Sequence, residues 1–389
     1  MVGPAPHTPE VRDLWGLDYS TLIVNHGSYG ATPLEVLARQ DEWRRLMEAN
    51  PTLFMQRDLP GAIRDAAAVV GRAVGARGDD IVLVDNATAA INAVLASLPF
   101  GEGDEILLHS HTYGAVIRTA NHAASRTGAR VVTFDLPFPD TTGDDLVHVL
   151  VSALTDRTRL VILDHITSAS ALVFPLARMV AACRTANVPV LVDGAHGPGQ
   201  VPLDLEALGA DYYVGNGHKW WMGAKGAGFL WTAPARQAEL HPTIISWGYG
   251  NGYTAEFDWT GTRDWSAALV LPDAIAFHER LGGSALMAAN ARLAREAADT
   301  LAVRWGTRTV APELQAAMSM VQLPFSGEAT PERALAIRHE LLGLDCDLPV
   351  QALSGALWCR LSAQAYNLSS DYERLGDMVD MFNQRLQGK

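Results

Sequence analysis

The stretch from Tyr212 to Trp231, YYVGNGHKWWMGAKGAGFLW, contains the pattern from which the fold can be inferred. It begins with a short apolar run typical of a buried strand and ends with a second such run, AGFLW. Between them Lys219 stands beside Trp220 and Trp221, ahead of glycines at 223, 226 and 228. One interpretation of Lys219 is a surface lysine in a loop. The other is a reactive amine, because a lysine in a confined, partly apolar site can lose its proton and attack a carbonyl.

Outward from this stretch, apolar β-branched runs alternate with longer alanine-rich segments. The runs that predict strands cover residues 80–86, 104–110, 129–135, 159–165, 188–194, 211–216 and 227–231. Strands that alternate with helices form a largely parallel sheet, and runs this apolar are buried on both faces. The sequence therefore predicts an α/β fold with a mostly parallel central sheet covered by helices.

Beyond Trp265 the pattern changes to long helical segments followed by a strand–helix–strand order. We expect a large domain over residues 20–267 and a smaller α+β domain made of residues 1–19 and 268–389. The length of 389 residues and the hydrophobic content of 48% are sufficient for two connected cores.

The composition argues against several classes of protein. Lys and Arg number 30 and Asp and Glu number 43, so the formal charge of −13 disfavours binding to nucleic acid. The chain has three cysteines, a small and odd number that does not indicate a disulfide framework. The apolar runs are interrupted too soon for a membrane span, and no secretory leader opens the chain. We therefore expect a soluble cytoplasmic protein with no nucleic-acid or membrane partner.

Polar side chains follow the predicted strands at the points where the strands end. In open α/β sheets, ligands bind beyond the carboxyl ends of the strands. The residues concerned are Asn86, Ala87, Thr88, His111, Tyr113, His165, Thr167, Ser168, Asp193, His196, Asn216, His218 and Lys219. We therefore expect one ligand site along this edge of the sheet.

Asp193 and Lys219 come from adjacent strand ends and together indicate a cofactor. Taken alone, Asp193 could cap a helix, and Thr88 could be an ordinary N-cap. Pyridoxal phosphate is the carbonyl compound that uses both a lysine, as a Schiff base, and a carboxylate, opposite its pyridinium nitrogen. Thr88 stands where a predicted helix begins, and the amides and dipole of a helix N-terminus suit a phosphate. The sequence thus predicts pyridoxal phosphate as the cofactor.

Several motifs in order resemble one family over nearly the whole chain, from Asn25 to Asn367. They are VNHGSYGATP, DNATAAINAV, DHITSASALVFPL, VDGAHGPG, GNGHKWWMGAKGAGFLW, WTGTRDWSAAL and CRLSAQAYN. The chain is similar to the class V aminotransferase family of pyridoxal phosphate enzymes, of fold type I, and within it to the isopenicillin N epimerase-like branch. The resemblance implies a homodimer with shared active sites and a small amino-acid substrate.

The resemblance also implies a role for each matched residue. Lys219 matches the catalytic lysine that binds the cofactor covalently, Asp193 the partner of the ring nitrogen, and His196 the group near the phenolic oxygen. Tyr113 matches the residue stacked on the ring. The phosphate contacts match Ala87, Thr88, Asn216, His218 and, from the other subunit, Thr262. Asn86 and Ser168 are further expected cofactor contacts. Arg360 matches the arginine that binds the substrate α-carboxylate, and Ser28 lies in a loop beside the substrate.

The reaction stays open between several outcomes at the substrate Cα. The resemblance implies epimerase-like chemistry, in specialised metabolism of the antibiotic type. The alternatives are a C–S lyase that performs β-elimination, or a decarboxylating or oxidative deaminase, acting on a cysteine S-conjugate as in lincosamide-type biosynthesis. A cysteine desulfurase or an aminotransferase is less favoured, and a catalytically silent protein would be expected to lack Lys219 or Asp193.

Two other features are discounted. His109, His111 and His165 stand near strand ends, but no cysteine or carboxylate spacing completes a metal site with them, so no metal is expected. Cys346 lies in LDCDLPV, a turn between a predicted helix and a predicted strand, where an inert thiol is the better interpretation than a nucleophile.

Overall fold

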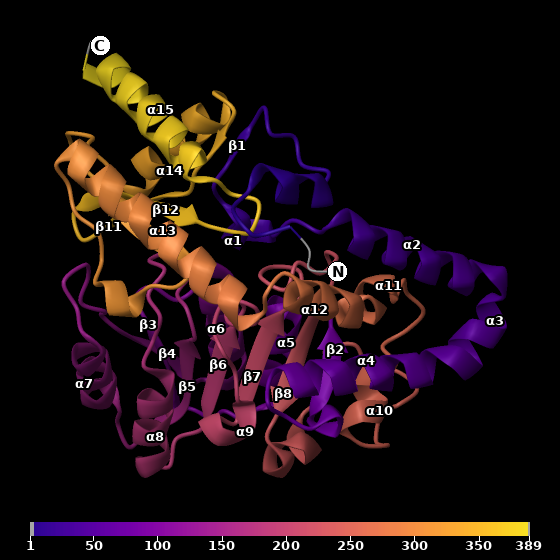
Figure 1. Cartoon of the computed structure of the whole chain (residues 1–389). Helices are drawn as coiled ribbons and strands as arrows, with labels where there is room; N and C mark the ends of the chain where they lie inside the picture. The colour runs from indigo at the N-terminus through magenta and orange to yellow at the C-terminus, as the bar shows by residue number, and fades with distance from the viewer. Residues whose placement is uncertain (1–3, 388–389) are drawn as a thin grey trace.

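The computed structural model of the chain describes residues 4–387, with side chains to residue 385. Its centre is a seven-stranded sheet in the order β2-β8-β7-β6-β5-β3-β4 (Figure 1). The strands are β2 (Ile81–Val84), β3 (Glu105–His109), β4 (Arg130–Phe134), β5 (Thr158–Asp164), β6 (Val190–Gly194), β7 (Tyr212–Asn216) and β8 (Gly228–Thr232). Strand β8 is antiparallel to both neighbours, and the pairs from β7 to β4 are parallel. The predicted fold class is confirmed.

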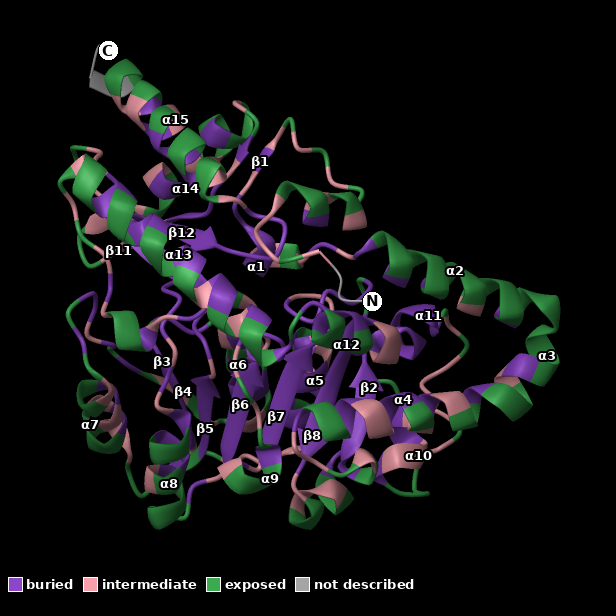
Figure 2. Ribbon diagram, in the orientation of Figure 1, coloured by how far each residue is buried: buried purple, intermediate pink, exposed green. Residues whose placement is uncertain are grey.

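Helices bury both faces of this sheet, which explains why its central strands are mostly apolar; the edge strand β4 is the exception, with only Phe134 buried. Helices α5 (Ala87–Ser97) and α6 (Gly114–Thr127) share one hydrophobic cluster with Ile106 and Ile162. Helices α4 (Leu59–Ala73), α8 (Leu176–Thr185) and α12 (Leu271–Arg280) share another with Leu107 and Val161. Successive side chains of a strand point to opposite faces of the sheet, so these strands contribute residues to both clusters. Figure 2 shows the strands buried and the helices exposed along their outer sides.

The C-terminal part is built on a second, three-stranded antiparallel sheet in the order β11-β12-β9. Its strands are β9 (Met318–Gln322), β11 (Val350–Leu353) and β12 (Ala356–Ser362), with helices α13 (Ser284–Trp305), α14 (Pro331–Leu342) and α15 (Ser369–Gln387). Near the N-terminus, β1 (Leu22–Ile23) pairs in parallel with β10 (Cys346–Asp347). The domain boundaries stay a prediction, and residues 1–3 and 388–389 of the expected small domain lie outside the described residues.

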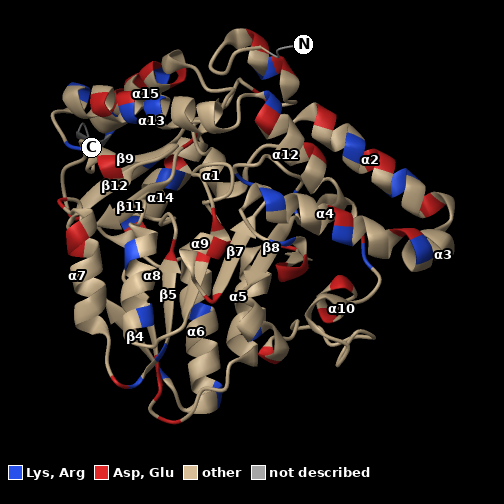
Figure 3. Ribbon diagram, turned by 60° about the horizontal axis from the view of Figure 1, so that its bottom comes forward, with Lys and Arg blue, Asp and Glu red and all other residues tan. Residues whose placement is uncertain are grey.

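The remaining helices connect these two parts or lie at their edges. They are α1 (His26–Tyr29), α2 (Leu34–Ala49), α3 (Pro51–Leu53), α7 (Gly143–Ala153), α9 (Leu205–Leu208), α10 (Tyr253–Asp258) and α11 (Ser266–Leu269). Many charged residues lie on helices such as α2 and α15, and few lie on the central strands (Figure 3). Within residues 4–387, no helix is long and apolar enough to cross a membrane.

Candidate active site

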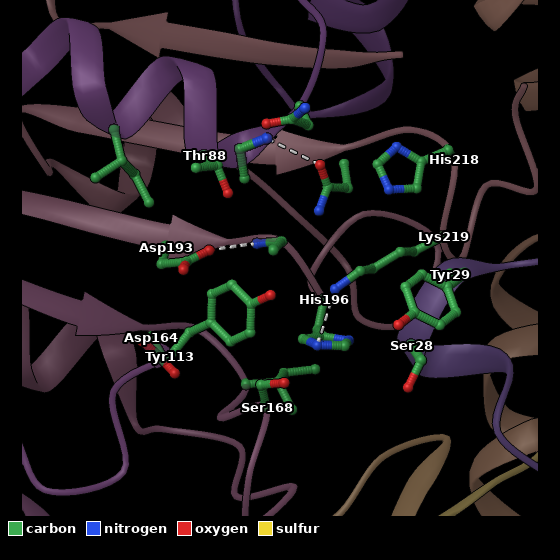
Figure 4. Close-up of a pocket in the computed structure, with 16 residues that line it drawn as sticks. Ser28, Tyr29, Thr88, Tyr113, Asp164, Ser168, Asp193, His196, His218 and Lys219 are labelled. Atoms are coloured by element: carbon green, nitrogen blue, oxygen red, sulfur yellow. Dashed lines mark hydrogen bonds between the residues drawn. The ribbon is translucent and has the colours of Figure 1, made fainter. Parts of the chain in front are cut away.

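A cavity of about 210 Å³ lies at the carboxyl ends of the central strands. It gathers side chains from β5, β6, β7 and the helices that follow β2 and β3 (Figure 4). Its lining includes the following residues expected from the sequence: Ser28, Asn86, Ala87, Thr88, Tyr113, Ser168, Asp193, His196, Asn216, His218 and Lys219. The strand-end argument therefore located a real cavity, but His111, His165 and Thr167 of the same strand ends do not line it. The roles of the lining residues stay predictions.

Lys219 follows β7, and its side chain extends into the cavity (Figure 4). The Nζ atom lies 3.2 Å from Nε2 of His196. Burial, and next the charge of Arg360, lower the pKa of Lys219 to about 8. Its backbone is fixed by a hydrogen bond, in which Nε2 of the buried His26 donates to the Lys219 carbonyl at 2.9 Å. Lys219 is therefore a buried amine that loses its proton more readily than an ordinary lysine.

The hydrogen bonds of His196 determine where its proton lies. The indole Nε1 of buried Trp220 donates to Nδ1 of His196 at 3.3 Å. Burial lowers the pKa of His196 well below its ordinary value, so the ring is neutral and carries its proton on Nε2. That Nε2–H can only donate to Lys219, and an amine accepts a hydrogen bond only through a lone pair. The arrangement favours Lys219 as a free amine.

Asp193 ends β6 and is 6% exposed, at the floor of the cavity. Its Oδ1 accepts the backbone N–H of Ala195 at 3.0 Å. Burial, and next the charge of the neighbouring Asp164, raise the pKa of Asp193. A positive group in the cavity would restore its negative charge, as the ring nitrogen of pyridoxal phosphate would.

Asp164 is a cavity residue that the sequence interpretation missed. It ends β5 directly beside Asp193 in the sheet register, and both side chains line the cavity. Its Oδ1 lies 3.5 Å from Nε2 of His109. Burial lowers the pKa of His109 to about 3, so its ring is neutral and the contact is not an ion pair. Burial raises the pKa of Asp164 well above its ordinary value. The signal was present, because Asp164 stands at the end of the predicted strand 159–165.

The first turn of α5 forms another part of the cavity wall. Oδ1 of Asn86 caps this helix by accepting the N–H of Ala89 at 3.0 Å. Oδ1 of Asn216, from β7, accepts the N–H of Ala87 at 2.9 Å and so ties the helix start to the sheet. Thr88 and His218 also face the cavity here. A helix N-terminus in this position suits the phosphate group of the expected cofactor.

Arg360 reaches the site from β12 of the C-terminal sheet and is 4% exposed. Nη1 donates to the carbonyl of Ser168 at 2.5 Å, and Nη2 donates to Asn25 and Ser28 at 3.0 Å each. Within the described residues its Nε has no hydrogen-bond partner, and no carboxylate forms an ion pair with it. A buried guanidinium without a protein counter-ion is a site for an anionic ligand.

Arg360 lines an adjoining cavity and not the first one. Two more expected residues, Tyr113 and Thr262, also differ from the rest in where they lie. Tyr113, at the start of α6, is half exposed and enters the cavity from the side opposite Lys219 (Figure 4). Thr262 lies in an exposed loop and is not among the residues that line the cavity of its own chain. Its contact with a partner's cofactor stays a prediction.

The fold and the cavity define a class of enzyme before any relative is considered. A doubly covered α/β sheet with lysine, aspartate and a helix N-terminus at one cavity is the arrangement of fold type I pyridoxal phosphate enzymes. The family model Aminotransferase class-V matches residues 30–375. The chain belongs to the class V aminotransferase family, so the predicted family and its dependence on pyridoxal phosphate are confirmed.

Individual relatives carry different activities in their names. The chain is 35% identical to a putative L-cysteine desulfhydrase of Oryza sativa subsp. japonica, over 92% of this chain and 82% of that one. It is 32% identical to the isopenicillin N epimerase of Streptomyces clavuligerus, over 95% and 97%. The solved complex of the cystine C–S lyase C-DES with cysteine persulfide matches the fold with a TM-score of 0.80, at 24% identity over 92% and 97%.

Proposed function

We propose that this enzyme removes the Cα proton of a cysteine-type amino acid and eliminates its sulfur substituent, as a C–S lyase. The observation that carries the proposal is the chain from Trp220 through His196 to Lys219, which favours a free amine inside the cavity. An amine that has lost its proton is the group that can take a proton from carbon. Names of relatives that include L-cysteine desulfhydrase support the same reaction.

The side chains present fit the expected cofactor. Lys219 would hold it covalently until the amino group of the substrate took its place and left Lys219 as a free amine. Asp193 would face its ring nitrogen, and the first turn of α5 with Thr88 would hold its phosphate. When bound, pyridoxal phosphate supplies an electron sink for the negative charge at the substrate Cα. Asp193 is buried, so its interaction with a cation is screened little by water.

Arg360 and Lys219 would have separate roles toward the substrate, one in binding and one in proton transfer. Arg360 would hold the α-carboxylate, for which a planar guanidinium is suited, with Ser28 fixing one of its nitrogens. This orients the Cα–H bond toward Nζ of Lys219, which takes the proton. The Cβ–S bond breaks and the sulfur leaves as a thiol, and water converts the remainder to pyruvate and ammonium.

The cysteines favour a lyase over a desulfurase. All three cysteines of the chain, Cys183, Cys346 and Cys359, are buried. Burial raises the pKa of Cys346 to about 12, so its thiol is not a nucleophile at neutral pH. A desulfurase transfers sulfur to a reactive thiol, and no accessible thiol stands at this cavity among the described residues. The sulfur would therefore leave the enzyme.

Epimerisation is the second candidate, and Tyr113 is the observation that favours it. An epimerase removes the Cα proton on one face and returns one on the other, which calls for proton-transfer groups on both faces. Tyr113 and Lys219 enter the cavity from opposite sides (Figure 4). The relatives named isopenicillin N epimerase support this alternative.

Incubation of the holoenzyme in D₂O with L-cysteine and S-alkyl-L-cysteines separates the candidates. The proposal expects thiol, pyruvate and ammonium in equal amounts, α-deuterium in recovered substrate, and loss of all of these in Lys219→Ala. Deuterium with inverted configuration and no released thiol would establish the epimerase instead. Release of CO₂ without α-deuterium would overturn proton removal by Lys219.

A further inference from the structure

A second cavity, of about 410 Å³, adjoins the first and is lined by both parts of the chain. Ser28, Tyr113, Ser168 and Lys219 line both cavities, so the second opens onto the reacting end of the site. Its lining includes the guanidinium groups of Arg338 and Arg360 as well as the amine of Lys219, and none of its described lining residues is acidic. A site that needed only to hold an α-carboxylate beside the cofactor would not require this additional cationic space.

Arg338 is the cation that the proposed reaction does not use. It lies on α14 and is half-buried, one turn from the buried Ala334 and beside the buried Ile337. Positions four apart lie on one face of a helix, so Arg338 belongs to the inner side of α14 rather than its solvent face. Among the described residues it has no ion pair and no hydrogen bond through its guanidinium.

Arg338 and Arg360 act on each other through their charge. After burial, the charge of Arg338 is the next cause that lowers the pKa of Arg360 to about 10. Two guanidiniums that face one cavity repel each other, and an anion between or beside them would relieve the repulsion. Nη1 of Arg360 already donates to Ser168, and Nη2 donates to Asn25 and Ser28. These hydrogen bonds fix the guanidinium in one orientation, in which it can bind one anionic group of a ligand.

We propose that Arg338, with Gln351 of β11 on the same cavity wall, forms a second anion-binding subsite. The substrate would then be an amino acid whose side chain ends in its own acidic group, such as a carboxylate on the sulfur substituent of a cysteine conjugate. Arg360 would take the α-carboxylate and Arg338 the distal one. The inference rests on the proposed placement of the substrate at Arg360, and it holds for any reaction at Cα.

Matched acid and amide substrates test the subsite in the holoenzyme. S-(2-carboxyethyl)-L-cysteine and S-(2-carbamoylethyl)-L-cysteine have the same shape and differ in charge. The measured quantity is the ratio of kcat/KM for the acid to kcat/KM for the amide. We expect the wild type to favour the acid, and Arg338→Gln to lower the ratio by about 10- to 100-fold, as for loss of a charged hydrogen bond.

Two further variants show whether the effect is specific. Arg338→Lys keeps the charge and should retain part of the preference for the acid. Arg295→Gln removes an equal charge from the exposed face of α13, outside the cavity, and should leave the ratio at its wild-type value. Equal melting temperatures would show that the variants are folded. A ratio near one in the wild type, or an equal fall in Arg295→Gln, would overturn the subsite.

A second readout separates this inference from the C–S lyase proposal. Exchange of the α-proton in D₂O can be compared for L-glutamate and L-glutamine, which also differ only in charge. Faster exchange of glutamate that depends on Arg338, without thiol release from any conjugate, would keep the subsite and reject the lyase. Thiol release with no dependence on Arg338 would do the reverse.

Discussion

At the scale of single residues, the most unusual feature is the pair of carboxyl groups at Asp164 and Asp193. Adjacent parallel strands place the two side chains at the same level and on the same side of the sheet. Two negative charges this close and this buried are unfavourable. Burial raises both pKa values, and the charge of Asp164 raises the pKa of Asp193 further. Asp193 has a cavity for a cation beside it. Asp164 also lines the cavity, but its Oδ1 has no hydrogen-bond partner among the described residues and lies 3.5 Å from Nε2 of His109. Because burial raises its pKa well above the ordinary value, we assign Asp164 as the member that stays protonated.

This assignment predicts how the stability of Asp164→Asn depends on pH. A carboxyl group with a raised folded pKa favours the folded state fully below its unfolded pKa and loses that stability as pH rises. Asparagine has the same shape and does not ionise. The variant should therefore gain stability relative to the wild type as pH rises above about 4, by up to roughly 1.4 kcal/mol per pH unit until the folded pKa is passed.

Thermal melting of the wild type and Asp164→Asn between pH 5 and pH 8 measures this difference. Asp299→Asn, on the exposed face of α13, is the matched control and should show no such trend. A melting-temperature difference for Asp164→Asn that stays constant with pH would show that Asp164 is ionised in the folded protein.

Arg360 gives a second prediction at this scale. Arg360→Lys keeps the charge and loses the planar fork that holds Ser168, Asn25 and Ser28. The α-carboxylate should bind less tightly by about 1.5–3 kcal/mol, which is about a 10- to 150-fold increase in KM if substrate binding is at equilibrium. Steady-state kinetics on S-alkyl-L-cysteines measure it, and an unchanged KM would remove Arg360 from the substrate site.

At the scale of elements, the lysine loop depends on close backbone contacts. Gly30 ends α1 with φ +70°, and a Cβ at this position would collide with the carbonyl oxygen of His218. The collision would displace the backbone that carries Lys219. Gly30 therefore allows α1 and the lysine loop to touch, a contact between segments nearly 190 residues apart in the chain.

We expect Gly30→Ala to lower stability by about 1–3 kcal/mol and to reduce kcat by moving the Lys219 amine. Gly103→Ala is the matched control, because Gly103 also has a positive φ, of +82°, but nothing lies within 4 Å of its Cβ position. The control should lose stability from backbone strain alone and keep its kcat. If both variants kept the same kcat, the contact with the lysine loop would have no catalytic consequence.

The elements also show how far the sequence alone could predict the site. The strand-end argument succeeded for Asp193, Asn216 and Lys219 because parallel strands bring their carboxyl ends to one edge. Asp164 stands at such an end, but its importance depends on the register with β6, which no single strand reveals. Local sequence also gave no reason to place Arg338 beside Arg360, because packing of α14 over the C-terminal sheet brings them together.

At the scale of the whole molecule, the site is assembled from both ends of the chain. The N-terminal α1 contributes Ser28, the central sheet contributes Lys219, and the C-terminal sheet contributes Arg360. The resemblance identified Arg360, which composition and periodicity could not have done. It also placed Thr262 at the site, but in a single chain Thr262 stays in an exposed loop, so we propose that a homodimer completes the phosphate end of the cavity.

A mixed dimer tests whether Thr262 acts across the subunit boundary. Thr262→Ala should weaken binding of pyridoxal phosphate by about 10-fold, since a charged hydrogen bond to the phosphate is lost. In a heterodimer with Lys219→Ala, the subunit that keeps Lys219 would receive an intact Thr262 from its partner. That site should regain wild-type cofactor affinity and activity, while the other site lacks both groups. Thr185→Ala, an exposed threonine on α8, serves as the control in place of Thr262→Ala.

The alternative arrangements predict different results for the same heterodimer. If Thr262 served its own subunit, the site that keeps Lys219 would retain the defect of Thr262→Ala, and mixing would restore nothing. If the enzyme worked as a monomer, dilution would leave the cofactor bound and the activity per chain unchanged. If each active site takes its phosphate contact from the neighbouring subunit, no single subunit holds a complete set of cofactor-binding groups. Only this arrangement predicts both recovery of activity in the heterodimer and loss of cofactor when the dimer is diluted to monomers.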